Sequence, residues 1–295
     1  MPKRASGRTV GGLRSLSLQA PAVTLLLLWM LIPLGMTLWF SFQHYNLLMP
    51  GEPSFVGLEN YEYLFTDPSL WRAMGNTLLM VGWILVISVG GGTLLAVLFQ
   101  QEFKGRGIAR VLAISPFFVM PTVSALIWKN LMMHPDNGVL AWLTESVGLP
   151  AIDWFSWVPM TSVVIIVSWQ WLPFALLILL TAIQSLDEDQ VEAARMDGAG
   201  PVDIFRFITL PHLKRAISVV IMIEMIFLLT LFAEIYVTTS GGPGLATTNL
   251  AFLIYIQALL DFDVGMASAG GVVAIILANI VAIFLVRLVA RNLEE

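Results

Sequence analysis

The sequence contains no cysteine and only three histidines. Without cysteine the chain has no disulfide framework, no iron–sulfur cluster and no thiol nucleophile, and three scattered histidines (His44, His134, His212) leave little to build a zinc site. Charge is also scarce, since charged residues make up 12% of the 295 residues against roughly 25% in soluble domains. The net charge of −5 argues against nucleic acid, which calls for a basic patch. We therefore expect no redox chemistry, no bound metal and no nucleic-acid partner.

Apolar residues, by contrast, make up 58% of the chain. Six stretches carry almost no charge over the roughly 20 residues that a helix needs to cross a bilayer. They cover residues 22–43, 76–99, 109–131, 158–183, 216–239 and 266–290. Because lipid satisfies no backbone polar groups, each stretch is expected to be a helix. We therefore predict an all-α, polytopic membrane protein with six transmembrane helices in a single transmembrane domain.

The placement of basic residues predicts the orientation of these spans. Every Lys and Arg except Arg72 and Lys129 falls before the first span, in the turn after the second, in the loop after the fourth, or near the C-terminus. Since positive charge collects on the cytoplasmic side, both termini are predicted to be cytoplasmic. The cytoplasmic segments are then 1–21, 184–215 and 291–295, and the periplasmic segments are 44–75, 132–157 and 240–265.

Four basic residues precede the first span: Lys3, Arg4, Arg8 and Arg14. This arrangement resembles a signal peptide, but the apolar stretch is too long and no small-residue cleavage site follows it. We interpret the segment as an uncleaved anchor.

Helix-breaking residues interrupt several spans. They are Pro33 in the first span, Gly90–Gly92 in the second, Pro116 and Pro121 in the third and Pro173 in the fourth. Glycine and proline are common in membrane helices, so each one taken alone indicates packing or a kink more readily than a hinge. Together they fit a bundle that encloses a cavity and changes shape.

The cytoplasmic segment between the fourth and fifth spans has the pattern of two helices. Ser185 and Glu188 match a capping box, and Asp187 and Asp189 place negative charge at the positive end of the helix dipole, so a helix is expected to start there. Gly198 suits the left-handed conformation that ends a helix.

A second helix is expected to begin at Pro201, which is tolerated in a first turn. Ile204, Phe205 and Ile208 would form its apolar face, and Leu210-Pro211 would end it. An interfacial helix on the headgroups is the alternative, but the acidic run 187–192 would be repelled by an anionic inner leaflet. The pattern therefore favours docking onto another protein.

The same segment resembles a known family. Glu192-Ala-Ala-Arg-Met-Asp-Gly198-Ala, followed by Ile208-Thr-Leu-Pro211, resembles the EAA loop in permease subunits of binding-protein-dependent ABC importers. Further segments resemble the maltose-type sugar permeases and, within them, the sorbitol/mannitol polyol permeases; these are Phe55–Tyr61, Trp71 with Asn76-Thr77, Asn137–Leu140, Thr239–Pro243 and Thr247-Thr248.

This resemblance implies a type I importer fold with six spans, in the inner membrane of a bacterial cell. It implies a second homologous permease subunit, a dimer of ABC ATPase subunits and a periplasmic solute-binding protein as partners. It assigns coupling to the ATPase to Glu192, Ala193, Ala194, Asp197, Gly198, Phe205, Leu210 and Pro211. The sequence has no GxxxxGK[ST] phosphate loop, so ATP and Mg are expected in the ATPase subunit, and this chain is expected to be no enzyme and to bind no cofactor.

Polar side chains within spans are candidates for the substrate path, because burying them is costly. Glu224 and Glu234 lie ten residues apart in the fifth span, or about 80° around a helix, so both can face the bundle interior. A structural role is as plausible as a substrate contact for Glu224, whereas Glu234 beside Tyr236 is the better ligand candidate.

Amides and aromatic rings supply the remaining candidates for the path: Asn76, Trp128, Trp169 and Gln170, with Asn279 a weaker one. Trp169 and Trp171 point about 160° apart, so at most one of them is expected to line the path. Aromatic faces and amides suit a sugar or polyol. A phosphate or carboxylate would need Lys or Arg, and only Lys129 lies near the outer depth.

Three other interpretations remain open. An ion-coupled secondary transporter would use Glu224 and Glu234 as a relay, but it has no need of the acidic helix pair. A membrane enzyme is disfavoured because no span carries a set of catalytic side chains on one face. The same importer family could also carry glycerol phosphate or an oligosaccharide.

Overall fold

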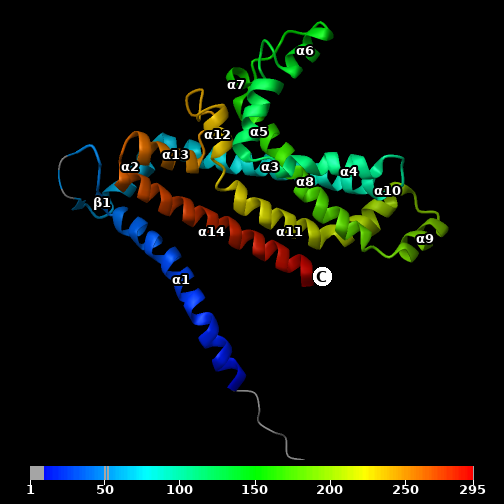
Figure 1. The fold of residues 1–295 in the computed structure, drawn as a ribbon, viewed down its shortest axis with the longest axis horizontal. Helices are drawn as coiled ribbons and strands as arrows, with labels where there is room; N and C mark the ends of the chain where they lie inside the picture. Colours follow the sequence, from blue (N-terminus) through cyan, green and yellow to red (C-terminus); the bar gives the residue numbers. More distant parts are fainter. Residues whose placement is uncertain (1–9, 50, 52, 295) are drawn as a thin grey trace, which may run out of the picture.

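A computed structural model describes residues 10–49, 51 and 53–294, and the structural statements below concern those residues. The chain is mostly helical, with one pair of two-residue strands. Five long helices form its frame (Figure 1): α1 (Val10–Phe40), α3 (Pro68–Gln100), α8 (Pro159–Gln184), α11 (Leu210–Leu228) and α14 (Val264–Glu294). The basic residues Lys3, Arg4 and Arg8 lie outside the described part of the chain.

Shorter elements connect the long helices. Between α1 and α3 lie the antiparallel strands β1 (Gln43–His44) and β2 (Ser54–Phe55) and the helix α2 (Glu59–Thr66). Between α3 and α8 lie α4 (Arg106–Ile114), η1 (Ser115–Phe118), α5 (Pro121–Ile127), η2 (Trp128–Met132), α6 (Val139–Ser146) and α7 (Trp154–Trp157). The later connections contain α9 (Glu188–Met196), α10 (Pro201–Ile204), η3 (Phe205–Thr209), α12 (Ala233–Thr238), α13 (Leu250–Tyr255) and η4 (Ile256–Leu260).

The pairing of α3 with α8 forms the centre of the bundle. Its close approach depends on small residues, because a Cβ atom on Gly92 would lie 2.7 Å from the Cβ of Ala175, and one on Gly91 would lie 2.7 Å from Leu172 Cδ1. Gly90 has nothing within 4 Å of the corresponding position. Gly91 and Gly92 therefore serve helix packing. The helix α11 packs against α8 and α3, and α14 packs against α11 and α13.

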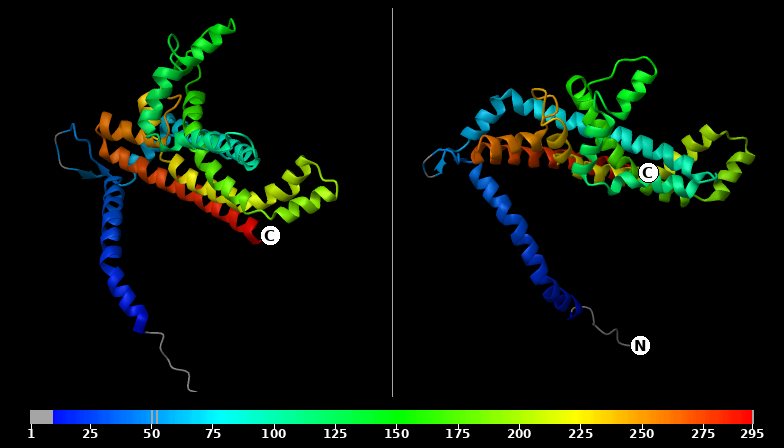
Figure 2. Two further views of the ribbon diagram at one scale, coloured as in Figure 1. Left: turned by 45° about the vertical axis from the view of Figure 1, so that its right-hand side comes forward. Right: turned by 45° about the horizontal axis from the view of Figure 1, so that its top comes forward.

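The first helix stands apart from this bundle. Figures 1 and 2 show α1 diverging from the other long helices, and its contacts are with α14 and β1. The most apolar part of Gln19–Phe40 contains no buried residue. Most of the apolar surface described for this helix is therefore free to meet lipid or a partner.

Four helices are long and apolar enough to cross a membrane: Gln19–Phe40, Pro68–Gln100, Pro159–Gln184 and Val264–Phe284. A fifth crossing is possible where Arg106–Phe118 and Pro121–Met132 form a pair bent by 109°. The stretch 109–131 is thus a broken element and not the single helix expected from hydropathy, and the break lies in the region that Pro116 and Pro121 mark. The bend follows from Pro121, because the residue before a proline avoids helical geometry and Met120 has an extended ψ of 141°.

The expected fifth span, 216–239, is also divided in the structure. α11 begins at Leu210, ends at Leu228 and is followed after a four-residue break by α12. The segments expected as loops also contain structure, since 44–75 includes α2 and the first two turns of α3, and 240–265 includes α13. Apolar length predicts the presence of these elements better than their ends.

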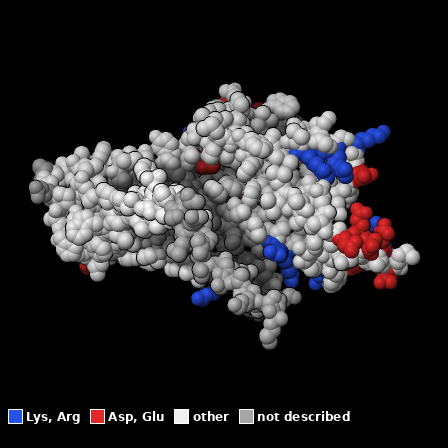
Figure 3. Space-filling model, turned by 60° about the horizontal axis from the view of Figure 1, so that its bottom comes forward, with Lys and Arg blue, Asp and Glu red and all other residues white. Residues whose placement is uncertain are grey.

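The molecule has two distinct ends. In Figure 1, α2, α12 and α6 lie along one side, and α9 and the C-terminal end of α14 lie along the other. Figure 3 shows a face on which most of the surface carries no charge, with Asp and Glu gathered in a compact patch at the end near α9 and Lys and Arg beside them. This division is typical of a bundle whose middle lies in lipid.

Candidate functional site

The hairpin formed by residues 185–211 is built from local capping interactions. α9 begins at Glu188, and Asp187 caps it by accepting a hydrogen bond from the backbone N–H of Asp189 at 3.0 Å. The expected capping box is therefore wrong, because the Ser185 hydroxyl instead donates to the carbonyl of Ala182 at 2.8 Å. Gly198 ends the helix with φ of 86°, in the left-handed region.

The second arm of the hairpin does not end at Leu210-Pro211 as expected. α10, η3 and α11 follow one another without a break, and Leu210 keeps helical angles of φ −64° and ψ −42°. The π-helical turn lets the N–H of Leu210 reach the carbonyl of Phe205, which widens the helix just before Pro211. The hairpin is therefore a direct extension of α11.

His212, at the start of α11, contacts the end of α8 at the base of the hairpin. Its Nε2 atom lies 3.0 Å from the carbonyl oxygen of Ala182 and 3.2 Å from Ser185 Oγ. This contact joins the start of α11 to the end of α8, so the base of the hairpin is held at both helices. Sequence reasoning treated His212 as an isolated histidine and did not identify this role.

The expected coupling residues divide by exposure. Glu192, Ala193, Asp197, Gly198 and Pro211 are exposed. The other three, Ala194, Phe205 and Leu210, are half-buried, and Phe205 lines a pocket of about 440 Å³ between the hairpin and the end of α3.

Three apolar side chains on the hairpin are more exposed than those predicted to dock. Met196 is 88% exposed, Val202 is 75% exposed and Phe207 is 68% exposed. They project from an acidic surface, where Asp187 and Glu192 are exposed. The sequence did not identify these three side chains as exposed, because their exposure depends on how the hairpin turns at Gly198.

Several polar residues predicted to line the substrate path are engaged with the backbone. Gln170 donates to the carbonyl of Val119 at 2.8 Å, at the bend between η1 and α5. Asn76 donates to the carbonyls of Leu245 and Thr248 at 2.8 and 2.9 Å. Both amides therefore satisfy carbonyl groups that no regular helix pairs.

Two further side chains act in the same way around the divided fifth span. The amide of Asn249 donates to the carbonyl of Leu231 at 2.5 Å, within the break between α11 and α12. Lys129 donates to the carbonyl of Val237 at 2.9 Å, near the end of α12. Non-helical backbone at membrane depth is tolerated where protein groups satisfy it, and these contacts supply such groups.

The aromatic candidates are packed against other rings. Trp128 and Trp169 meet edge to face with ring centroids 5.7 Å apart, and Trp171 lies 5.3 Å from Phe227. Tyr236 is 48% exposed and stacks on Phe232 at 5.6 Å. Tyr236 is thus the most accessible of the aromatic candidates, since Trp128 and Trp169 are half-buried.

The two carboxylates of the fifth span have different surroundings. Glu224 is fully buried and accepts a hydrogen bond from the Ser88 hydroxyl of α3 at 2.5 Å, whereas its second oxygen, Oε1, has no partner among the described residues. Glu234 is buried on α12, beyond the break. The structure therefore places the two carboxylates on separate helices.

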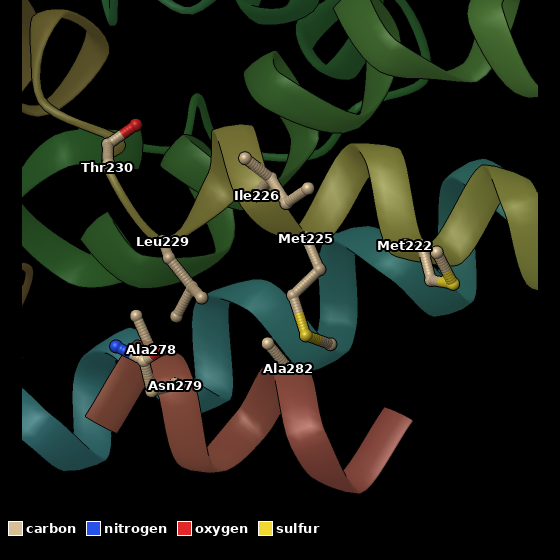
Figure 4. Close-up of a pocket in the computed structure, with 8 residues that line it drawn as sticks. All are labelled: Met222, Met225, Ile226, Leu229, Thr230, Ala278, Asn279 and Ala282. Atoms are coloured by element: carbon tan, nitrogen blue, oxygen red, sulfur yellow. The ribbon is translucent and has the colours of Figure 1, made fainter. Parts of the chain in front are cut away.

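A pocket of about 350 Å³ lies between α11 and α14 (Figure 4). Six of its eight lining residues are apolar, and the polar pair is Thr230 and Asn279. Figure 4 shows Met225 and Leu229 facing Ala278 and Ala282 of α14, whereas Ile226 and Thr230 point away from α14. Asn279, the weaker candidate from sequence, is thus the amide that lines a cavity, although its Nδ2 also donates to the carbonyl of Ile275.

Comparison with known proteins decides the family. Residues 88–295 match the family described as binding-protein-dependent transport system inner membrane components. The chain belongs to this family. The predicted family is thereby confirmed, and the chain is a permease component of the ABC transporter class in a membrane that it crosses several times.

Relatives of this permease cover most of its length. It is 36% identical to a probable ABC transporter permease protein of Sinorhizobium fredii, over 84% of this chain and 81% of that protein. It is 33% identical to a trehalose/maltose transport system permease protein of Thermococcus litoralis, over 84% of each chain. A sulfoquinovosyl glycerol transport system permease protein of Agrobacterium fabrum is 32% identical, over 92% of this chain and 89% of that one.

The fold of the permease is shared with a solved transporter. A chain in the crystal structure of a bacterial ABC transporter involved in alginate import aligns with a TM-score of 0.78 at 23% identity, covering 93% of this chain and 94% of that chain. The family match contains the hairpin and the α11/α14 pocket, whereas α1 and α2 precede it.

Proposed function

We propose that this permease is the membrane subunit of an ATP-driven importer for a neutral sugar or polyol, which a periplasmic binding protein delivers. A second homologous permease and a dimer of ATPase subunits complete the assembly, and ATP hydrolysis takes place in the ATPase. α11 and α12 together form the fifth span, which brings the number of crossings to six, and both termini are cytoplasmic.

The observation that carries the coupling role is the exposure of Met196. An apolar side chain that is 88% exposed, at the end of an acidic helix, is best explained by insertion into a protein partner. No residue of α9 is buried within this chain. The acidic surface disfavours the inner leaflet as the partner, so the ATPase subunit is the proposed receptor for α9.

The continuous helix from α10 into α11 indicates how movement of the hairpin would reach the pocket. A movement of the hairpin passes directly into α11, and the His212 contact ties the same movement to the end of α8. α11 forms one wall of the pocket that contains Asn279. Rocking of the docked hairpin would therefore open and close that pocket by alternating access.

The chemistry of the pocket supports a neutral substrate. Its lining contains no charged residue. The Asn279 amide and the Thr230 hydroxyl each donate to a backbone carbonyl, and their oxygens can accept hydrogen bonds from sugar hydroxyls. Lys129, the cation expected near the outer depth, is already bound to the carbonyl of Val237. The trehalose/maltose relative supports a sugar, and the polyol preference rests on sequence resemblance.

The decisive experiment uses the complete transporter reconstituted in vesicles with its binding protein. ATP hydrolysis is measured against a panel of sugars, polyols and sugar phosphates. We expect stimulation by a neutral sugar or polyol and none by the phosphates; stimulation by phosphates alone would overturn the substrate class.

The coupling role is tested with Gly198→Asp. We expect this variant to remain in the membrane and in the complex but to lose solute uptake, because a side chain is strained at φ of 86° and an added carboxylate disturbs the docking surface. Gly105→Asp is the matched control, since Gly105 has φ of 84° in a different cytoplasmic turn. Normal uptake by Gly198→Asp would refute the role.

A further inference from the structure

α6 and the residue that follows it carry a row of exposed apolar side chains, which no described residue covers. Val139, Trp142, Leu143 and Val147 are between 45% and 72% exposed. A spacing of i, i+3 and i+4 places Val139, Trp142 and Leu143 on one face of the helix, and Val147 follows at its C-terminal end. Ala141, which is 3% exposed, lies on the opposite face, so the row points away from the body of the protein.

The position of α6 is limited by the elements before and after it. η2 ends at Met132 and α8 begins at Pro159, so both ends of the intervening segment lie where membrane-spanning elements end. Figures 1 and 2 show α6 beyond the side of the bundle, on the side of the molecule that also carries α2 and α12. The helix therefore lies beside the bundle, near the boundary of the bilayer.

The residue types of this segment fit that boundary. Trp142 and Trp157 are 66% and 67% exposed, and exposed tryptophan is enriched where membrane meets water. Glu145 is exposed at the edge of the apolar row and can face water. No Lys or Arg occurs between Lys129 and Arg195, as expected for the side opposite the cytoplasm.

A protein partner fits the row less well. Stable interfaces bury about 20–30 residues on each side. The row on α6 contains four apolar side chains, and the rim around it carries no basic residue to pair with a charged partner. Its dimensions suit partial burial in lipid.

We propose that α6 is an interfacial helix, which lies along the outer surface of the bilayer with its apolar row among the lipid headgroups and upper acyl chains. It would anchor the segment 133–158 and, through η2, hold Lys129 against α12. This inference requires that the chain is in a membrane, but it does not rest on the coupling role of α9 or on the identity of the substrate.

The absence of cysteine allows a direct test. Leu143→Cys carries a nitroxide spin label in the assembled transporter, in vesicles of phosphatidylethanolamine and phosphatidylglycerol. Collisions with oxygen, which concentrates in lipid, are compared with collisions with a water-soluble nickel chelate. We expect oxygen collisions to dominate at Leu143→Cys, and also at Val147→Cys, which checks the result at a second position.

Glu145→Cys is the matched control on the same helix, about 160° around from Leu143. We expect nickel collisions to dominate there. Dominant nickel collisions at position 143 would show that the row faces water and would overturn the proposal. Weak collisions with both reagents, or loss of collisions when the binding protein is added, would show that a protein covers the row and would also overturn it.

Discussion

Gln170, Asn249 and Lys129 each donate a hydrogen bond to a carbonyl at a helix break or helix end. From the sequence, Gln170 is one of several candidates for the substrate path, because a polar side chain in a membrane span is costly without a purpose. In the structure, Gln170 instead donates a hydrogen bond to a backbone carbonyl group. A single sequence cannot separate these uses, since the carbonyl partners lie 18 to 108 residues away.

The contact between Glu224 and Ser88 leads to a prediction for a single residue. Glu224→Gln is expected to preserve ATP-driven uptake, because the Ser88 hydroxyl can donate to an amide oxygen as it does to the carboxylate. The measurement is uptake into vesicles with the membrane potential collapsed. Burial of the unpaired amide N–H groups would lower stability by about 1–3 kcal/mol.

The matched control is Glu224→Leu, which removes the acceptor for Ser88 altogether and tests whether that contact is needed at all. An ion-coupled transporter that uses Glu224 as a relay would lose transport in Glu224→Gln. That outcome would contradict the importer proposal.

At the scale of elements, the sequence predicts a helix or a bend correctly where residues within that segment determine it. The stretch 158–183 is the uninterrupted helix α8, which continues through Pro173, and the stretch around Pro116 and Pro121 contains the 109° bend. The break after Leu228 could not be predicted, because residues 229–232 contain neither glycine nor proline. It depends on Asn249, which satisfies the freed carbonyl of Leu231 from a later segment.

The contact between α3 and α8 yields a prediction at the same scale. Gly92→Val is expected to destabilise the permease by about 1–3 kcal/mol, because overpacking displaces neighbouring atoms. A Cβ there would lie 2.7 Å from the Cβ of Ala175 and 3.0 Å from the backbone nitrogen of Leu176. Thermal unfolding of the purified protein in detergent measures the effect.

Gly90→Val provides the control for Gly92→Val. It introduces the same side chain two residues away, where nothing lies within 4 Å of the new Cβ. An equal loss of stability in both variants would show that helix propensity, and not contact with α8, is responsible.

At the scale of the whole molecule, the distribution of Lys and Arg predicts its orientation in the cell. Ser156→Cys and Gln101→Cys place single thiols on exposed residues of α7 and of the turn after α3, which are predicted to face opposite sides of the membrane. A membrane-impermeant maleimide should label position 156 on intact cells, and position 101 only after the membrane is permeabilised, because basic segments stay inside. The cysteine-free parent measures background labelling, and the reverse pattern would contradict the predicted topology.

The unbroken path from α10 through η3 into α11 also limits how such proteins can be recombined. Because the hairpin and the pocket wall share one helical axis, adding or deleting one residue between them would rotate one against the other by about 100°. A hairpin transplanted from a related protein would have to preserve both the number of residues and the π-helical turn. If either changed, the pocket would keep its orientation, but the exposed face of the hairpin would turn away from its receptor.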